Sequence, residues 1–156
     1  TDIYFNTDCT NIDMKKNLKT QYLNLLSELS TVSEIDDVVF ESNLISINSM
    51  GTIVVGYVYN DSNDLNSIEL VGSGTIIIEP KIIRGGKSVG HIEDIVTKSN
   101  WRGKKIAQSI LNQLCNHASK SNCYKVILDC VESVCGVYST NGFKIKGVQM
   151  AKYFDN

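Results

Sequence analysis

The chain has 156 residues, of which 42% are hydrophobic and 21% are charged, and its formal net charge is −2. This length predicts a single domain, residues 1–156, which buries about two-thirds of the surface of its unfolded chain. A charge this close to zero excludes a general electrostatic attraction to nucleic acid, so any anion site in the chain must be local.

Two helices are predicted at the start of the chain. Residues 14–30 place Leu18, Tyr22 and Leu25 at helical spacing, and a second, short helix is predicted at 36–42. From residue 43 onward the apolar residues recur at every second position or in short runs, which predicts consecutive strands. These strands span residues 43–48, 51–60 and 72–80, and a polar loop covers 61–69. An antiparallel meander is the most economical arrangement for them.

The second half of the chain alternates strands and helices. Residues 89–97 predict a strand, and residues 103–119 predict a helix with Ile106, Ile110, Leu114 and Ala118 on one face. A buried strand at 124–130, a short helix at 132–142 that Gly142 ends, and a last strand at 143–153 follow. The fold class is therefore α/β, with a mixed central sheet flanked by helices.

The sequence also argues against a membrane anchor and a metal centre. No apolar run approaches the roughly 18 residues that span a bilayer, and the N-terminus, with Asp2, Asn6 and Asp8, does not resemble a secretory signal. Five cysteines without a CxxC pair, and two histidines, favour reduced thiols over disulfides or a zinc site. These cysteines are Cys9, Cys115, Cys123, Cys130 and Cys135. We expect a cytoplasmic protein with no metal and with no membrane or nucleic-acid partner.

The turn "WRGKKIA", residues 101–107, leads into the long helix of the second half. A helix N-terminus carries unpaired N–H groups and a partial positive charge, so a basic, glycine-containing turn before it is suited to bind an anion such as pyrophosphate. A solvated basic turn explains this segment equally well. Neither a Walker loop nor a dinucleotide-binding GxGxxG motif is present.

Motifs around this turn carry a family resemblance. "GHIEDIVT", "RGKKIA", "CYKVILDC" and "VYSTNGF" together resemble the GNAT superfamily of acetyl-CoA-dependent N-acetyltransferases, and more narrowly the family of glucosamine 6-phosphate N-acetyltransferases. The resemblance runs from about Gly74 to Met150, and "GHIEDI" and "YKVILDC" are its most specific parts. It implies the GNAT acyl-CoA N-acyltransferase fold and acetyl-CoA as co-substrate.

The resemblance implies where acetyl-CoA binds. The backbone at Ile95, Val96 and Thr97 pairs with the pantetheine arm, and the turn binds the pyrophosphate. The turn residues are Arg102, Gly103, Lys104, Lys105, Ile106 and Ala107. Val131 and Val134 depart from the polar residues that the family commonly has there, which puts some cofactor contacts in doubt.

Three acids match positions that contact the amino sugar in the family, namely Glu93, Asp94 and Asp129. Adjacent side chains on a strand point to opposite faces, so Glu93 and Asp94 face one pocket only if a bulge intervenes. Glu93 and Asp129 are the candidate acceptors of the amine proton. For Asp129 the alternative is a carboxylate that caps the following helix.

Tyr138 matches the family's tyrosine beside the cofactor sulfur, where a phenol can protonate the leaving thiolate. Without the family pattern, an aromatic residue that packs the last helix on the sheet is the preferred interpretation. His91 is expected to pack or to orient its neighbours rather than to act as a base.

The sugar phosphate requires cations, and the segment "KIIRGGK" supplies them. By resemblance its first four residues, Lys81, Ile82, Ile83 and Arg84, contact the substrate, as does the hydroxyl of Ser30. The family often has an arginine near the C-terminus that reaches the phosphate of the neighbouring subunit, whereas this chain has Tyr153 preceded by Lys152. Lys152 is the candidate substitute, although it lacks the bidentate fork of arginine. The resemblance implies a homodimer with the C-terminal strands at its interface.

The implied reaction is acetylation of D-glucosamine 6-phosphate by direct attack on acetyl-CoA, a step toward UDP-N-acetylglucosamine. Two alternatives stay open. One is a GNAT enzyme that acetylates a protein N-terminus or a lysine, which has no use for the cations of residues 81–87. The other is a non-catalytic acetyl-CoA-binding module, for which loss of Glu93, Asp129 or Tyr138 would be evidence, yet all three are present.

Overall fold

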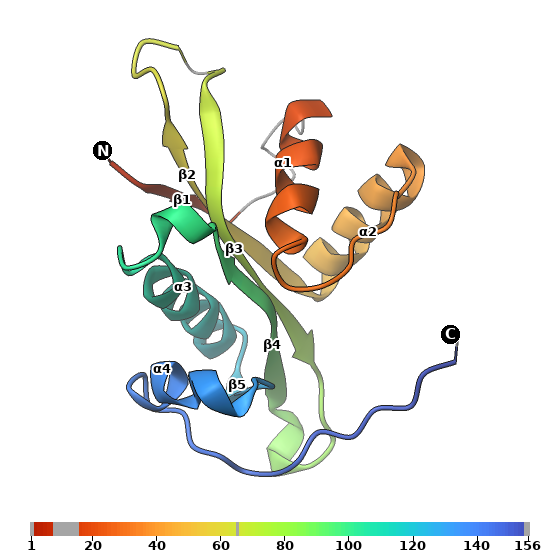
Figure 1. Ribbon diagram of the computed structural model, residues 1–156. Helices are drawn as coiled ribbons and strands as arrows, with labels where there is room; N and C mark the ends of the chain where they lie inside the picture. The colour runs from red at the N-terminus through yellow and green to blue at the C-terminus, as the bar shows by residue number, and fades with distance from the viewer. Residues whose placement is uncertain (1, 8–15, 65, 155–156) are drawn as a thin grey trace.

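The computed structural model describes residues 2–7, 16–64 and 66–154, and its centre is a five-stranded mixed sheet (Figure 1). The strands are β1 (Tyr4–Asn6), β2 (Gly51–Tyr59), β3 (Ile68–Glu79), β4 (Ser88–Thr97) and β5 (Cys123–Leu128), and they lie side by side in this order. Strands β1 to β4 are antiparallel, and β5 is parallel to β4. Of the predicted meander, the antiparallel pair at 51–60 and 72–80 is confirmed as β2 and β3. The crossover between β4 and β5 contains the long helix, as parallel neighbours require.

Helices cover both faces of the sheet (Figure 1). On one face lie α1 (Lys16–Leu26) and α2 (Asp37–Met50); on the other lies α3 (Ile106–Lys120), and the short α4 (Cys135–Ser139) follows β5. Three short 3₁₀ turns complete the described structure: η1 (Arg84–Gly86), η2 (Ser99–Trp101) and η3 (Glu132–Val134). The predicted α/β class is confirmed. Among the described helices, none has the length and apolar character needed to cross a membrane.

Each face of the sheet has its own apolar core. The four residues predicted to share one face of the long helix are all buried, and they pack on Val54 and Ile76 of the sheet. On the opposite face, Leu18 and Tyr22 of α1 and Phe40 of α2 pack on the sheet through a second cluster. Successive side chains of a strand alternate between these two cores, which explains why no residue of β2 or β3 is exposed.

Helix α2 corrects the prediction of a strand at residues 43–48. Asp36 caps this helix by accepting hydrogen bonds from the backbone N–H groups of Val38 and Val39, and the helix then continues to Met50. Leu44 and Ile47 pack on the second core one and two turns after Phe40, at helical spacing. Ile45, whose alternation with Ile47 suggested a strand, is exposed on the outer side of this helix.

The remaining differences concern boundaries and edges. Strand β3 begins at Ile68, inside the predicted polar loop, and the three-residue β1 was too short to be recognised. Strand β5 was predicted to be buried, but it lies at the edge of the sheet and is only half-buried. Part of the first predicted helix, residues 14 and 15, lies outside the described residues, as does Cys9.

The predicted last strand, residues 143–153, is absent: the tail is extended and pairs with no strand among the described residues (Figure 1). Its apolar side chains face solvent, with Ile145 81% and Met150 92% exposed. A strand needs a neighbour to accept its backbone hydrogen bonds, and the described part of the chain supplies none here.

Candidate active site

A β-bulge interrupts β4 where the two adjacent acids lie. Two residues of β4, Asp94 and Ile95, stand opposite the single residue Gly74 of β3. Asp94 has a φ of 54°, which is the left-handed region that few residues other than glycine adopt. Glu93 and Asp94 were expected to face one pocket only if a bulge interrupted the strand, and this bulge is present.

The bulge changes which face each later residue of β4 occupies. Before it, Ile92 packs into the α3 core; after it, Val96 packs into the α1 and α2 core. In an uninterrupted strand these residues, four apart, would share one face. Glu93 consequently lies on the same face as Val96, on a part of the sheet where its side chain is exposed.

Strands β4 and β5 separate directly before Glu93. Their pairing ends at Ile92 and Leu128, although β4 continues to Thr97. Among the described residues, no strand pairs with the β5-facing edge of residues 93–97, and the buried hydroxyl oxygen of Thr97 has no hydrogen-bond partner. Asp129 directly follows β5, so Glu93 and Asp129 lie on the two sides of the gap between the strands.

The carboxylates on this gap interact electrostatically. Partial burial, followed by the negative charges of Asp94 and Asp129, raises the pKa of Glu93, whereas His91 acts in the opposite direction. Glu93 and Asp94 are adjacent in β4, and Asp129 follows the end of β5, so the three carboxylates border the same gap between the strands. A carboxylate whose pKa is raised toward neutral pH is a better general base than an ordinary one.

Asp129 is not a helix cap, so that alternative is wrong. Neither η3 nor α4 has a side-chain cap, and Asp129 Oδ2 instead accepts a hydrogen bond of 3.0 Å from Nε2 of Gln149 in the tail. Gln149 was missed by the sequence reasoning, because a contact between residues so far apart leaves no local pattern.

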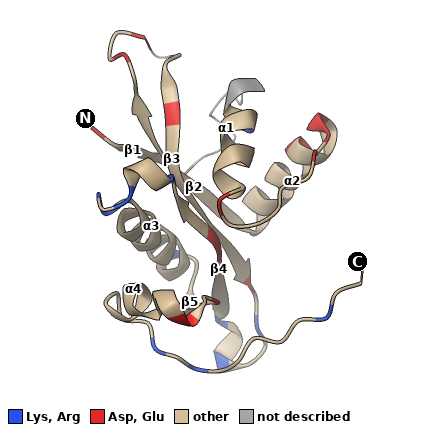
Figure 2. Ribbon diagram, in the orientation of Figure 1, with Lys and Arg blue, Asp and Glu red and all other residues tan. Residues whose placement is uncertain are grey.

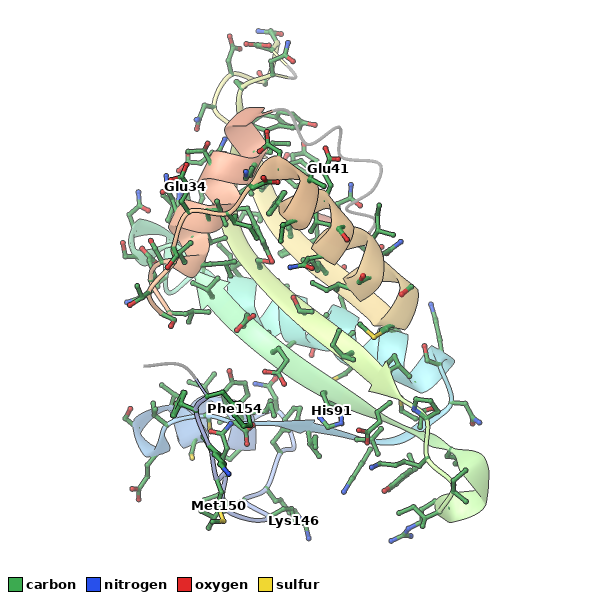
Figure 3. The ribbon with its side chains drawn as sticks, turned by 90° about the vertical axis from the view of Figure 1, so that its right-hand side faces the viewer. Glu34, Glu41, His91, Lys146, Met150 and Phe154 are labelled. Atoms are coloured by element: carbon green, nitrogen blue, oxygen red, sulfur yellow. The ribbon has the colours of Figure 1, made fainter. Side chains whose placement is uncertain are left out.

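A polar row extends from Glu93 along the same face of the sheet. His91, two residues before Glu93, projects from β4 on this face (Figure 3), and its Nε2 lies 3.6 Å from Oε1 of Glu79. Glu79 also forms an ion pair with Lys81, which lowers the pKa of the Glu79 carboxyl. The orienting role expected for His91 is consistent with this position between two carboxylates.

The cations predicted to contact substrate lie in the loop between β3 and β4. Arg84 adopts a φ of 57° and stacks on the ring of Tyr124 at 5.4 Å, while Ile82 is 95% exposed and Ile83 is also exposed. The loop ends where β4 begins at Ser88, five residues and so about 17 Å before Glu93 at about 3.3 Å per residue. Lys81 thus lies at the end of the row formed by His91 and Glu79, whereas Arg84 lies over Tyr124 of β5. Neither cation has a described contact with Glu93, Asp94 or Asp129.

The basic turn precedes α3 as a true turn, because the helix begins at Ile106 rather than at Gly103. Gly103 and Lys105 have φ values of 81° and 61°, and no side chain caps the helix. Its first backbone N–H groups therefore remain available to an anion. Figure 2 shows the basic residues of this turn beside the end of β4.

The basic side chains of this turn make only weak contacts with the rest of the protein. An Arg102 guanidinium nitrogen lies 3.9 Å from Oε2 of Glu28, and Lys104 lies over the ring of Trp101 at 5.7 Å. Both side chains are exposed, so these contacts contribute little to stability and leave the charges free for a ligand.

Tyr138 lies in α4, next to the end of β5. Its half-buried ring packs edge-to-face on Phe143, with 6.0 Å between the centroids, and joins the α3 core. Burial and then the charge of Cys130 raise the pKa of its hydroxyl, so this group stays protonated at neutral pH. Both interpretations of Tyr138, the packing residue and the proton donor, fit this position.

Several residues predicted to contact the substrate do not meet the rest of the site in the described structure. Ser30 is exposed in the turn after α1, and Lys152 lies over the ring of Phe154 at 6.0 Å, with no described contact to the cations of residues 81–84. Tyr153 is 87% exposed. The departures Val131 and Val134 are exposed beside η3.

Comparisons with known proteins agree with this geometry. The acetyltransferase (GNAT) family matches residues 21–143. The glucosamine 6-phosphate N-acetyltransferase of Arabidopsis thaliana is 34% identical over 134 residues, covering 86% of this chain and 88% of the relative. The Candida albicans protein of the same name is 35% identical, covering 86% and 87%. The crystal structure of the Arabidopsis thaliana protein superposes with a TM-score of 0.84 at 28% identity, covering 99% of this chain and 100% of that chain.

Proposed function

Because the chain belongs to the acetyltransferase (GNAT) family, and within it to the glucosamine 6-phosphate N-acetyltransferases, we propose that it acetylates the amine of D-glucosamine 6-phosphate. The acetyl donor is acetyl-CoA, and the product is N-acetyl-D-glucosamine 6-phosphate, a precursor of UDP-N-acetylglucosamine. The single observation in the structure that carries this proposal is the group of three carboxylates at the gap between β4 and β5. The 156 residues act as a single acetyltransferase domain in the cytoplasm.

The site has the features that acetyl-CoA requires. The unpaired edge of β4 at Ile95, Val96 and Thr97 offers backbone groups to an extended amide-bearing arm, and the Thr97 hydroxyl offers one more. The turn at residues 102–107 offers uncapped N–H groups and cations to the pyrophosphate. When bound there, acetyl-CoA supplies an activated acetyl thioester.

The acids prepare the amine for attack. The amine of the sugar enters as an ammonium ion and must lose a proton, which Glu93 accepts directly or through a water molecule. Asp94 and Asp129 hold the ammonium ion beforehand, and their charges keep the pKa of Glu93 raised. The free amine forms the new C–N bond at the thioester carbonyl, and the C–S bond breaks without a covalent enzyme intermediate.

Tyr138 completes the reaction on the other side of the carbonyl. The leaving thiolate has a conjugate-acid pKa of about 8.5, and a protonated phenol can give it a proton or a strong hydrogen bond. Since burial raises the pKa of Tyr138, the hydroxyl is protonated when the thiolate forms. The negative charge that it stabilises exists only late in the reaction.

The phosphate binds to Arg84 and Lys81, in the loop that also contains Ile82 and Ile83. The hydroxyl of Ser30 contacts the substrate by the family resemblance and has no described contact with this loop. Arg84 is already held over Tyr124, which leaves its guanidinium edge available for two parallel hydrogen bonds. A homodimer explains why Lys152 lies away from this loop in one chain: the exposed tail would pair with a second copy and place Lys152 at that copy's phosphate.

The first experiment measures release of CoA by the purified full chain with glucosamine 6-phosphate, glucosamine and a lysine-containing peptide in parallel. We expect strong activity with the sugar phosphate alone. Equal rates with both sugars would refute the phosphate site, and activity with the peptide alone would refute the sugar substrate while keeping the acetyltransferase. If acetyl-CoA binds but no acceptor reacts, a different acceptor or a binding module replaces the proposal.

A further inference from the structure

Two cysteine sulfurs are in contact beside the proposed active site. Cys130 follows β5 and Asp129, Cys135 begins α4, and their Sγ atoms are 3.6 Å apart. Cys130 is exposed and Cys135 is half-buried, so a small reagent reaches the pair from solvent. The proposed acetyl transfer uses neither thiol.

We propose that Cys130 and Cys135 are a redox-sensitive dithiol, which low-molecular-weight disulfides convert to an internal disulfide, and that this bond slows acetyl transfer by displacing Tyr138. The bond itself is independent of the enzyme's substrate, whereas its effect on turnover rests on the proposed function.

The geometry requires only a small movement. A disulfide has an S–S distance of about 2.05 Å, so the two sulfurs must approach by about 1.5 Å. The segment between them runs through η3, where residues 131–134 are all exposed and pack on little else. The sulfur of Cys135 also lies 3.9 Å from the carbonyl oxygen of Val131, inside the loop that the bond would close.

The other described cysteines lack this arrangement. Cys115 and Cys123 are half-buried in α3 and β5, and among the described residues neither sulfur has a contact with another thiol such as the one that joins Cys130 and Cys135. Cys130 and Cys135 are therefore the described pair that can both meet a reagent and resolve it.

Tyr138 is coupled to this pair through the same short segment. Cys135 and Tyr138 are three residues apart in α4 and so lie on the same side of the helix. The charge of Cys130 also acts on Tyr138, where it raises the pKa of the hydroxyl. Drawing the start of α4 toward β5 shifts the Tyr138 hydroxyl from its present position, and misplacement of about 1 Å can slow catalysis by about 100-fold.

The chemistry balances with oxidised glutathione as the disulfide. One cysteine thiolate attacks it, which forms a mixed disulfide and releases one glutathione; the second cysteine attacks that mixed disulfide and releases the other. The protein loses two hydrogen atoms and two electrons, and the reagent becomes two thiols. Burial, together with the hydrogen bond and charge from Cys135, raises the pKa of Cys130, so closure should accelerate as the pH rises.

The test treats the full chain, with Cys9 replaced by serine, with oxidised glutathione and then follows intact mass, disulfide mapping and CoA release. We expect a species lighter by two hydrogen atoms with a Cys130–Cys135 bond, turnover reduced at least about tenfold, and full recovery with dithiothreitol. The matched control is Cys123→Ser, which keeps the pair and should respond like the parent.

The single variants Cys130→Ser and Cys135→Ser separate the two parts of the proposal. Neither can close the bond, so each should gain at most one glutathione at the remaining cysteine of the pair and show no species lighter by two hydrogen atoms. If the parent yields only glutathione adducts and no internal bond, the dithiol is refuted. If the bond forms and turnover is unchanged, the effect on Tyr138 is refuted. If reduced protein fails to acetylate glucosamine 6-phosphate, the mass measurement still decides the dithiol, and it is the proposed function that fails.

Discussion

Replacing Tyr138 with phenylalanine removes one hydroxyl and leaves the ring that packs on Phe143. Among the described residues nothing hydrogen-bonds to that hydroxyl, so its loss leaves no buried group without a partner. We therefore expect the free energy of unfolding to change by less than about 0.5 kcal/mol, which is a shift of at most about 2 °C in Tm. The variant isolates the chemistry of the hydroxyl from its packing.

The effect on catalysis should be much larger. A hydrogen bond to a charged group contributes about 1.5–3 kcal/mol, and each 1.36 kcal/mol is a factor of ten in rate. Because the thiolate charge forms only as the C–S bond breaks, kcat should fall by about ten- to a hundredfold. The KM values for acetyl-CoA and for the sugar phosphate should change little.

Single-turnover measurements with saturating acetyl-CoA and sugar phosphate test this directly, because they exclude product release from the observed rate. Tyr4→Phe, on the edge strand β1 away from the site, is the matched control and should keep the parental rate. Full single-turnover rate in Tyr138→Phe, with folding intact, would show that the tyrosine is only a packing residue.

Three further predictions concern the base, the phosphate site and the bulge. Because the pKa of Glu93 is raised and the base must be ionised, the acid limb of kcat/KM should lie above the ordinary glutamate value of about 4.3, and Asp94→Asn, which removes a neighbouring negative charge, should move it to lower pH; an unmoved limb would mean that another group sets it. Arg84→Ala should raise KM for glucosamine 6-phosphate by about tenfold or more, corresponding to loss of a charged hydrogen bond, while leaving acetyl-CoA affinity unchanged in a binding titration. A methyl group at Gly74 would lie 2.5 and 2.7 Å from two isoleucine side-chain carbons, so Gly74→Ala should cost about 1–3 kcal/mol and lower Tm by about 3–9 °C, whereas Gly147→Ala, with open space around it, should not; equal melting of the two variants would contradict the packing opposite the bulge.

Local patterns in the sequence predicted the structure correctly where the apolar residues followed a single spacing. The face of α3 formed by Ile106, Ile110 and Leu114 is buried as predicted, because apolar residues at helical spacing have only one way to leave water together. The family motifs were equally decisive, since the predicted GNAT fold and family are confirmed. The assigned roles of the site residues stay predictions.

Patterns failed where competing periods or distant partners decided the outcome. Residues 43–48 alternate like a strand, yet packing of Leu44 and Ile47 on Phe40 selected a helix. The tail at residues 143–153 has the alternation of a strand, but within residues 2–7, 16–64 and 66–154 no neighbouring strand pairs with its backbone.

The sequence by itself determined the fold class, the family and the positions along the chain where acids, tyrosine and basic turn lie, because each of these depends on residues close together or on a recognisable motif. Only the tertiary structure decided how these segments meet. The bulge at Asp94 depends on the register of β3, the gap depends on where β5 leaves β4, and the Cys130–Cys135 and Asp129–Gln149 contacts depend on how the chain turns after β5. Register and strand divergence are properties of pairs of segments, and so no single segment encodes them.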